Sequence, residues 1–226
     1  MNDLTGFQQN GFAIVPNVLD AAAVAALLNA LTRVQLSDAV KQREGRAFGM
    51  RRLLELVPAV RVWAESDALL ALVHPILGDN AKVVRGIFFD KTPVANWKVP
   101  WHQDTMIAVR AKKDVAGFSA WSIKAGVVHT QPPVAVLTSI LTVRLHLDDT
   151  DETNGALRVI PGSHLHGVLS DDAVQQWKAR QSTVMCSVRS GGALLMRPLL
   201  LHASSVAAQP THRRVLHLEY SALDLP

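Results

Sequence analysis

The chain has 226 residues, of which 49% are hydrophobic and 19% are charged, with a formal net charge of +4. This composition suits one folded domain with a sizeable core and excludes a globally disordered chain. The Lys and Arg residues are scattered, which argues against nucleic-acid binding, whereas a modest positive charge suits an anionic small-molecule substrate. The single cysteine, Cys186, excludes an internal disulfide and a cysteine-based zinc site, and we expect it in a strand.

The N-terminal sequence MNDLTGFQQNGFAIVP lacks a basic segment followed by an apolar one. No apolar run reaches the length that a membrane span requires. We therefore expect a soluble, cytoplasmic protein with no membrane partner, and no feature of the sequence predicts its oligomeric state.

The first eighty residues are predicted to be mostly helical, after a short strand at 11–15. Asp20 can cap a helix whose apolar residues follow helical spacing, namely Val24, Leu27, Leu28, Leu31 and Val34. Ser66 can cap a second helix, which is disturbed by Pro75 and ends at Gly78. We expect both helices to pack on one face of a sheet.

From residue 82 the chain consists of short apolar runs separated by turn residues, including VVRGIFF, VLTSILTVRLHL, ALRVI and GALLMRP. This pattern predicts an all-β core over 81–226, and the segment 1–80 is its helical buttress within one domain spanning 1–226. Two long segments, 91–101 and 110–133, are predicted to be irregular loops that cover a site.

His102-Gln103-Asp104 forms an H-x-D triplet, and alternate residues of an extended segment point to the same side. Two imidazoles and one carboxylate are the ligands of non-haem iron(II) oxygenases, so a third ligand is needed from elsewhere. His146 and Asp148 have the same spacing, but Asp148 runs into the acidic turn DDTDETNG and is more simply explained as a turn residue.

His202 follows the apolar run LLMRPLLL and precedes small residues, which suits a side chain that emerges from a strand into a confined site. A buried structural histidine is the alternative. Arg213 and Arg214 begin the strand-like sequence RRVLHLEYS, and one of them could bind a dicarboxylate through its planar guanidinium. Alternation places the two on opposite faces without indicating which points inward.

Together, WHQD at 101–104, NGALRVIPGSHLHG at 154–167 and LLLHASS followed by Arg213 resemble the phytanoyl-CoA dioxygenase family of iron(II)/2-oxoglutarate oxygenases. The resemblance covers roughly 80–221 and implies a mainly β fold with flanking N-terminal helices, a cupin-like double-stranded β-helix or jelly roll. In the PGSH segment turns are the better explanation, so His164 and His166 are not assigned to the metal.

The resemblance also implies the cofactor and cosubstrates, which are Fe(II), 2-oxoglutarate and O2. His102, Asp104 and His202 match the metal ligands, and Arg213 matches the arginine that pairs with the distal carboxylate of 2-oxoglutarate. Further positions that match cosubstrate contacts are Gln103 and Ser204. Arg144 stands where many relatives carry an aromatic residue, and it is a candidate to bind a carboxylate of either cosubstrate or substrate.

The expected reaction is hydroxylation of a small organic substrate, because related halogenases replace the carboxylate that Asp104 supplies with a small residue. Two alternatives stay open: an inactive jelly roll that binds metal or ligand, and a lyase or isomerase that uses a different metal. Candidate substrate contacts are Trp97, Trp101, Trp121 and His129 on the long segments, and Arg51 and Arg52 from the helical part. Packing and solvated surface roles compete for all of these residues.

Overall fold

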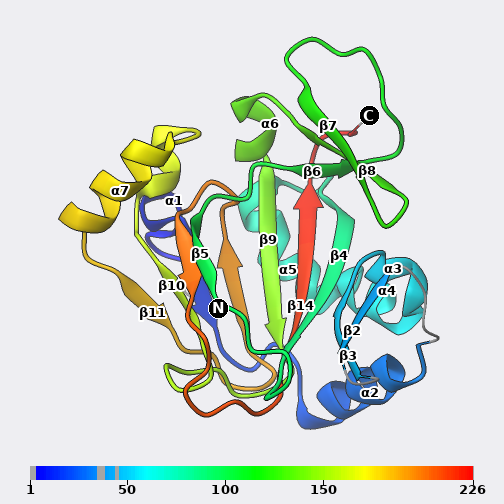
Figure 1. Ribbon diagram of the computed structural model, residues 1–226. Coiled ribbons are helices and arrows are strands. Elements are labelled where there is room, and N and C mark those ends of the chain that lie inside the picture. The colour runs from blue at the N-terminus through cyan, green and yellow to red at the C-terminus, as the bar shows by residue number, and fades with distance from the viewer. Residues whose placement is uncertain (1–3, 35–38, 44–45, 226) are drawn as a thin grey trace.

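The computed structural model describes residues 4–34, 39–43 and 46–225, whose strands form three antiparallel sheets (Figure 1). The large sheet has the order β1-β12-β9-β14-β4-β3-β2, the second β11-β10-β13-β5, and the third β6-β8-β7. The strands are β1 (Phe12–Val15), β2 (Val40–Arg43), β3 (Arg46–Met50), β4 (Lys82–Lys91), β5 (Val99–His102), β6 (Ile107–Val109), β7 (Ser119–Lys124), β8 (Val127–Gln131), β9 (Ile140–His146), β10 (Leu157–Val159), β11 (Val184–Cys186), β12 (Ala193–Met196), β13 (His202–Ser204) and β14 (Arg213–Ser221).

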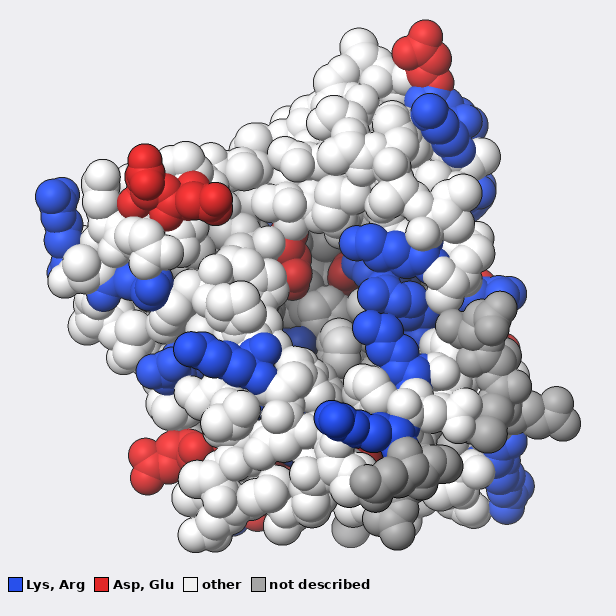
Figure 2. All heavy atoms as spheres, in the orientation of Figure 1, with Lys and Arg blue, Asp and Glu red and all other residues white. Residues whose placement is uncertain are grey.

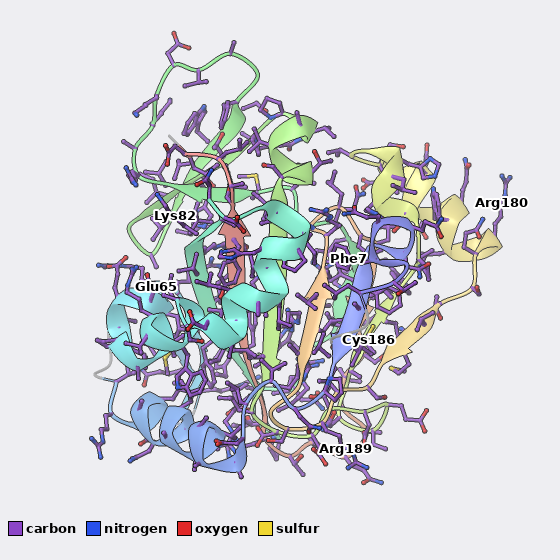
Figure 3. The ribbon with its side chains drawn as sticks, turned by 180° about the vertical axis from the view of Figure 1, so that it is seen from behind. Phe7, Glu65, Lys82, Arg180, Cys186 and Arg189 are labelled. Atoms are coloured by element: carbon purple, nitrogen blue, oxygen red, sulfur yellow. The ribbon has the colours of Figure 1, made fainter. Side chains whose placement is uncertain are left out.

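The four-stranded sheet packs against one face of the large sheet. Leu157 of β10 and Cys186 of β11 share a buried cluster with Leu194 and Met196 of β12, so apolar side chains join the two sheets. Cys186 lies in a strand as predicted and is fully buried (Figure 3). This arrangement confirms the predicted jelly roll, in which two antiparallel sheets enclose the interior.

Helices cover the other face of the large sheet (Figure 3). They are α1 (Phe7–Asn10), α2 (Ala21–Thr32), α3 (Leu53–Leu56), α4 (Pro58–Ala64) and α5 (Asp67–Leu77). Two further helices, α6 (Val134–Thr138) and α7 (Asp171–Arg180), pack in separate apolar clusters, and a 3₁₀ turn spans Ser163–His166. The main core joins Leu27 of α2 and Leu72 of α5 to Leu216, Leu218 and Tyr220 of β14. In the described part of the chain, no helix combines the length and apolar composition needed to cross a membrane.

The two predicted helix starts differ in how they are capped. The Asp20 carboxylate accepts a hydrogen bond from the Ala23 amide at 2.7 Å, as predicted for the cap of α2. Ser66 precedes α5, but its hydroxyl donates to the Trp63 carbonyl at 2.7 Å and does not cap the helix. The preceding helix α4 ends next to Ser66, so this carbonyl competes successfully for the hydroxyl.

Three predicted regions were assigned partly the wrong local structure. In the segment 91–101, predicted to be irregular, β5 begins at Val99. The segment 1–80 contains two strands besides β1, because β2 and β3 extend the large sheet beside β4. The segment 110–133 is not irregular throughout, because β7 and β8 form a hairpin. Its turn residues Ala125 and Gly126 both have positive φ, and alanine at the first position gave no sequence signal for such a turn.

Candidate metal and cosubstrate site

Three potential metal ligands meet where β5 and β13 pair. His102 ends β5, Asp104 follows two residues later, and His202 begins β13 directly opposite His102. The imidazole centroids of His102 and His202 are 4.2 Å apart, and their Nε2 atoms lie 3.6 and 3.7 Å from the two Asp104 carboxylate oxygens. One donor atom from each residue lies within 4.8 Å of the others, and the described residues contain no second group of this kind.

Backbone carbonyls fix the orientation of both imidazoles. Nδ1 of His102 lies 2.9 Å from the Pro100 carbonyl oxygen, and Nδ1 of His202 lies 2.8 Å from that of Leu200. A carbonyl oxygen only accepts, so each Nδ1 carries the proton and donates. The Nε2 lone pair of each ring is therefore directed to the site. A hydrogen bond from the other ring nitrogen to a carbonyl is usual for a metal-binding histidine.

The protonation states also suit a cation. Burial alone would raise the pKa of Asp104, but His202 and the hydrogen bond with His102 lower it well below its usual range. Burial lowers the pKa of His202 to about 4, so this imidazole is neutral near pH 7. Burial lowers the pKa of His102, but the contact with the Asp104 carboxylate and its negative charge outweigh burial and raise it, so a metal ion would compete with a proton for this imidazole. Two imidazoles and one ionised carboxylate are the donor set that iron(II) oxygenases require.

The competing H-x-D pair serves other purposes. The Asp148 carboxylate accepts two hydrogen bonds from the Arg214 guanidinium, at 2.8 and 2.6 Å. Nδ1 of His146 lies 2.7 Å from the Thr150 hydroxyl oxygen inside the barrel. This ion pair also shows which of the two neighbouring arginines faces outward, since Arg214 is committed to Asp148.

Beside the triad, three buried cations form what we call the cationic chamber: Lys91, Arg144 and Arg213. Arg213 of β14 lies opposite Lys91 of β4, and Arg144 of β9 lies opposite His217 of β14. These residues occupy the inner face of the large sheet, and each has 6% or less of its surface exposed. Among the described residues, no carboxylate forms an ion pair with any of the three.

Hydrogen bonds draw two of these cations to one hydroxyl. The Lys91 ammonium donates to Ser204 Oγ at 2.6 Å and to the Ser205 carbonyl. The Arg213 guanidinium donates to the Gly155 carbonyl and, at 3.3 Å, to Ser204 Oγ. Gly155 has φ +82°, and a Cβ there would lie 2.9 Å from the Lys91 nitrogen, so only glycine fits this close approach.

The chamber is electrostatically poised for an anion. Burial, with the charges of Arg213 and Arg144, lowers the pKa of Lys91 to about 7. Burial and the charge of Arg144 lower the pKa of Arg213 to about 9, and burial lowers that of Arg144 to about 10. Nε of Arg144 and Nε of Arg213 are buried without a hydrogen-bond partner. Uncompensated charge and unused donors both indicate a binding site for a carboxylate-bearing ligand.

A chain of polar side chains links the chamber to the protein surface. Arg144 donates to Nδ1 of His217 at 2.9 Å, and Nε2 of His217 donates to the Glu219 carboxylate at 3.3 Å. Arg85 donates to the same carboxylate oxygen at 2.9 Å and to Nε2 of His129 at 3.2 Å. Burial raises the pKa of Glu219, but Arg85 and His217 outweigh it and keep the carboxyl ionised.

A cavity of about 320 Å³ opens at the triad. Its lining includes His102, Asp104, Phe89, His217 and Glu219. Figure 2 shows a hollow in this face of the molecule, with Lys and Arg side chains along one rim and acidic groups inside. The cavity therefore joins the candidate metal ligands to solvent.

Gln103 has a structural role beside the one predicted. Its amide nitrogen donates to the Gly167 and Leu199 carbonyls, at 2.8 and 2.7 Å, and its oxygen accepts from the Leu169 amide at 2.8 Å. These three bonds tie the segment between the metal ligands to neighbouring loops. Both amide hydrogens are used in these bonds, and Gln103 also lines the metal cavity, so its contact with the cosubstrate stays a prediction.

The predicted substrate contacts divide into two groups. Trp101 packs on Ile160, Val174 and Leu201, and Trp121 belongs to a separate apolar cluster, so neither lines the metal cavity. Both tryptophan side chains pack in apolar clusters, which is the structural role that competed with substrate binding. By contrast, the lining residues of the cavity and the hollows around it include His129, Arg51, Arg52 and Trp97. Arg52 is half-exposed and paired with Glu55, which leaves Arg51 as the stronger candidate.

Sequence reasoning missed Lys91, Arg85, His217 and Glu219. A signal was present, because Arg85 and Lys91 are six residues apart on β4, and His217 and Glu219 lie four and six residues after Arg213 on β14, and an even separation in a strand places side chains on one face. Their common face could therefore have been read from the pattern. The strand pairing that brings the two rows together could not.

A jelly roll with two histidines and one carboxylate at the mouth of its interior defines the class of iron(II)- and 2-oxoglutarate-dependent oxygenases. Within that class, the chain belongs to the phytanoyl-CoA dioxygenase (PhyH) family, whose model matches residues 7–215. No curated protein matches the sequence.

Solved structures share the fold at low sequence identity. AviO1 from Streptomyces viridochromogenes Tue57 is 22% identical, with a TM-score of 0.71, over 99% of this chain and 95% of that chain. EctD from S. alaskensis, solved with 2-oxoglutarate and 5-hydroxyectoine, is 19% identical, with a TM-score of 0.73, over 96% of this chain and 74% of its own. The α-ketoglutarate-dependent epimerase SnoN from nogalamycin biosynthesis is 19% identical, with a TM-score of 0.66, over 96% and 79%.

Proposed function

We propose that this protein is a dioxygenase that hydroxylates an unactivated C–H bond of a small organic substrate, using Fe(II), O2 and 2-oxoglutarate. The observation that carries this proposal is the cationic chamber beside the triad, which provides buried positive charge and unused donors for a dicarboxylate. In this reaction one oxygen atom of O2 becomes the new hydroxyl group. The other enters succinate, which is formed from 2-oxoglutarate with release of CO2.

His102, Asp104 and His202 would hold the iron. Bound iron would let triplet O2, which reacts slowly with closed-shell organic molecules, accept electrons one at a time, and the net electrons would come from 2-oxoglutarate and the substrate. The chain contributes preorganisation: two backbone carbonyls orient the imidazoles, and the ionised Asp104 gives the donor set its negative charge. The carboxylate of Asp104 also supports hydroxylation over halogenation.

Arg213, Lys91 and Ser204 would hold the distal carboxylate of 2-oxoglutarate. The guanidinium offers a planar fork, the ammonium adds a second charge, and the hydroxyl that both contact orients them. Arg144 interacts electrostatically with Asp104 and would face the end of the cosubstrate nearer the metal.

The helices share one core with the sheet, which supports one domain over 1–226.

The proposal is tested by visible absorption of the purified protein, made anaerobic and supplied with iron(II) and 2-oxoglutarate. Chelation of iron(II) by a 2-oxo acid gives a weak charge-transfer band. We expect the band in the wild-type protein and its loss in His202→Ala. Arg213→Met should need a much higher 2-oxoglutarate concentration than wild type to give the same band intensity. Arg214→Met is the matched control and should behave as wild type, because Arg214 pairs with Asp148.

Product analysis then separates reaction classes on the same fold. Succinate formation together with a substrate 16 mass units heavier supports hydroxylation, since about one oxygen atom is added per turnover. Succinate with an epimer of unchanged mass would favour epimerisation, the reaction named for SnoN. Bound iron without the band would instead favour an inactive jelly roll or a lyase or isomerase that does not use 2-oxoglutarate.

A further inference from the structure

Three hollows meet at one arginine beside the candidate metal site. Arg51 and Ile87 line the metal cavity of about 320 Å³, a second hollow of about 210 Å³ and a third of about 100 Å³. Arg51 follows β3 directly, and its amide is fixed by a 2.8 Å hydrogen bond to the Ala39 carbonyl. Its side chain is half-buried, so a ligand in any of the three spaces can reach it.

The second hollow is lined mainly by apolar and aromatic side chains. Phe48 and Met50 of β3 form one side, and Ile87 and Phe89 of β4 form another. Trp97 closes it, with its ring 5.7 Å from that of Phe48 between centroids. Phe89 also lines the metal cavity, so the apolar hollow and the candidate metal site are directly adjacent. A space of this kind suits a carbon skeleton rather than a polar headgroup.

Positive charge surrounds the junction. Arg51, Arg85 and Lys124 line the metal cavity, and Arg85 is neutralised by Glu219 at 2.9 Å. Within the described residues, neither Arg51 nor Lys124 has an ion pair. Burial and the neighbouring Arg85 lower the pKa of Arg51, and no carboxylate opposes this shift.

His129, which lines the metal cavity and the third hollow beside Arg85, supplies no counter-charge. Its Nδ1 donates to the Val127 carbonyl at 2.9 Å, so its Nε2 carries the lone pair that accepts a hydrogen bond from Arg85. Burial and the charges of Arg85, Lys124 and Arg51 lower the pKa of His129, which keeps it neutral. The rim therefore has an excess of positive charge next to an apolar space.

We infer that the primary substrate is an amphipathic organic acid whose anionic group binds Arg51, supported by Lys124, and whose apolar skeleton occupies the hollow between Phe48, Phe89 and Trp97. The inference rests on the proposed function and names its substrate class. Because Arg51 lines both the hollow and the metal cavity, the carbons next to the anionic group lie nearest the triad. These are the carbons at which we expect hydroxylation.

The test measures binding to the anaerobic protein loaded with iron(II) and saturating 2-oxoglutarate, which keeps probes out of the cationic chamber. The probes are phenylacetate, 3-phenylpropionate and 4-phenylbutyrate, each paired with its primary alcohol. Ligand-observed NMR gives each Kd, and broadening of the probe resonances by paramagnetic iron(II) reports proximity to the triad. A charge-assisted hydrogen bond predicts that at least one acid binds about ten-fold or more tightly than its alcohol.

Variants separate the charge from the apolar hollow. Arg51→Met should remove the preference for the acid and leave alcohol binding unchanged, whereas Arg51→Lys should retain part of it. Phe48→Ala should weaken the acid and the alcohol alike. Arg189→Met is the matched control, since it removes the same charge from an exposed residue that pairs with Asp149 and lines none of these hollows.

The charge-transfer band in each sample distinguishes failure of the proposed substrate class from failure of the proposed function. A wild-type protein that shows the band but prefers no acid over its alcohol overturns the substrate class and leaves the proposed function standing. A preference that survives in Arg51→Met, or CoA thioesters that bind more tightly than the free acids, also overturns it. Absence of the band in wild type overturns both.

Discussion

The two faces of the large sheet are built from the same strands and serve different purposes. Along β14, Leu216, Leu218 and Tyr220 pack on the helices, and the Tyr220 hydroxyl donates to the Ala64 carbonyl at 2.8 Å. The alternating residues, which include Arg213, point into the barrel, where the three cations of the cationic chamber are buried without an ion pair. Stability is concentrated on the outer row and binding capacity on the inner one.

The difference is energetic as well as geometric. Apolar burial on the outer face stabilises the folded state by about 25 cal/mol per Å². Burial of unpaired cations on the inner face opposes folding, because a buried charge without a partner loses its hydration. The inner face is thus maintained by the outer one, and variants of the two rows should have effects of opposite sign on stability.

The largest expected effect is on the outer row. Leu218→Ala should lower the free energy of unfolding by roughly 2–5 kcal/mol, because Leu218 is fully buried and truncation leaves a cavity. Urea denaturation monitored by circular dichroism measures this change. Leu223→Ala, at a residue that is 45% exposed, is the control and should change little. Equal losses in both variants would contradict the assignment of the outer row as the stabilising one.

On the inner row, Arg213→Met should stabilise the ligand-free protein by about 1–2 kcal/mol, because an apolar side chain replaces an unpaired buried charge. Thermal unfolding without iron or 2-oxoglutarate measures the effect. Arg214→Met breaks an ion pair with Asp148 and should lower stability instead. If both variants lose stability, the cationic chamber is not a site of unfavourable charge.

Lys91→Met should weaken 2-oxoglutarate binding by about ten-fold, equivalent to about 1.4 kcal/mol, because one of the charges proposed for the distal carboxylate is lost. Titration of the charge-transfer band under anaerobic conditions gives the Kd. Lys82→Met, at an exposed residue on the same strand, is the matched control. An unchanged Kd in Lys91→Met would contradict the role of Lys91 and assign the distal carboxylate of 2-oxoglutarate to Arg213 without it.

A further expected effect is a pH dependence of stability. The pKa of Lys91 is about 7 in the folded protein against 10.5 as its ordinary value, so the unfolded chain binds more protons between these limits. The contribution of Lys91 to stability therefore rises with pH across this window, and below it the full cost of the buried charge is present. The advantage of Lys91→Met in melting temperature should be greatest below pH 7 and shrink above it. A pH-independent difference would show that Lys91 does not titrate there.

The sequence predicted the ligand set because its signals are local. His102 and Asp104 are two residues apart on an extended segment, and an apolar run precedes His202. The family resemblance implied that these three residues meet, and the pairing of β5 with β13, which brings them together, is seen only in the structure. Iron binding by these residues stays a prediction.

Other features depend on contacts that a local pattern does not contain. Alternation separated Arg213 from Arg214, but only the position of Asp148 identifies the outward residue. Lys91 ends a strand, where a lysine ordinarily reaches solvent, and its burial arises from the loop that carries Gly155. The strands β2 and β3 are rich in charged residues because they lie at the edge of the sheet, so their sequence has no apolar alternation that would predict strands.

The uncompensated charge of the chamber has a consequence for handling the protein. A pocket that presents three cations and unused donors does not distinguish strongly between small dianions, so sulfate, phosphate or citrate from a purification buffer will compete for it. Such ions would raise the melting temperature by binding only the folded state. They would also act as competitive inhibitors with respect to 2-oxoglutarate, which makes the choice of buffer part of any assay of this protein.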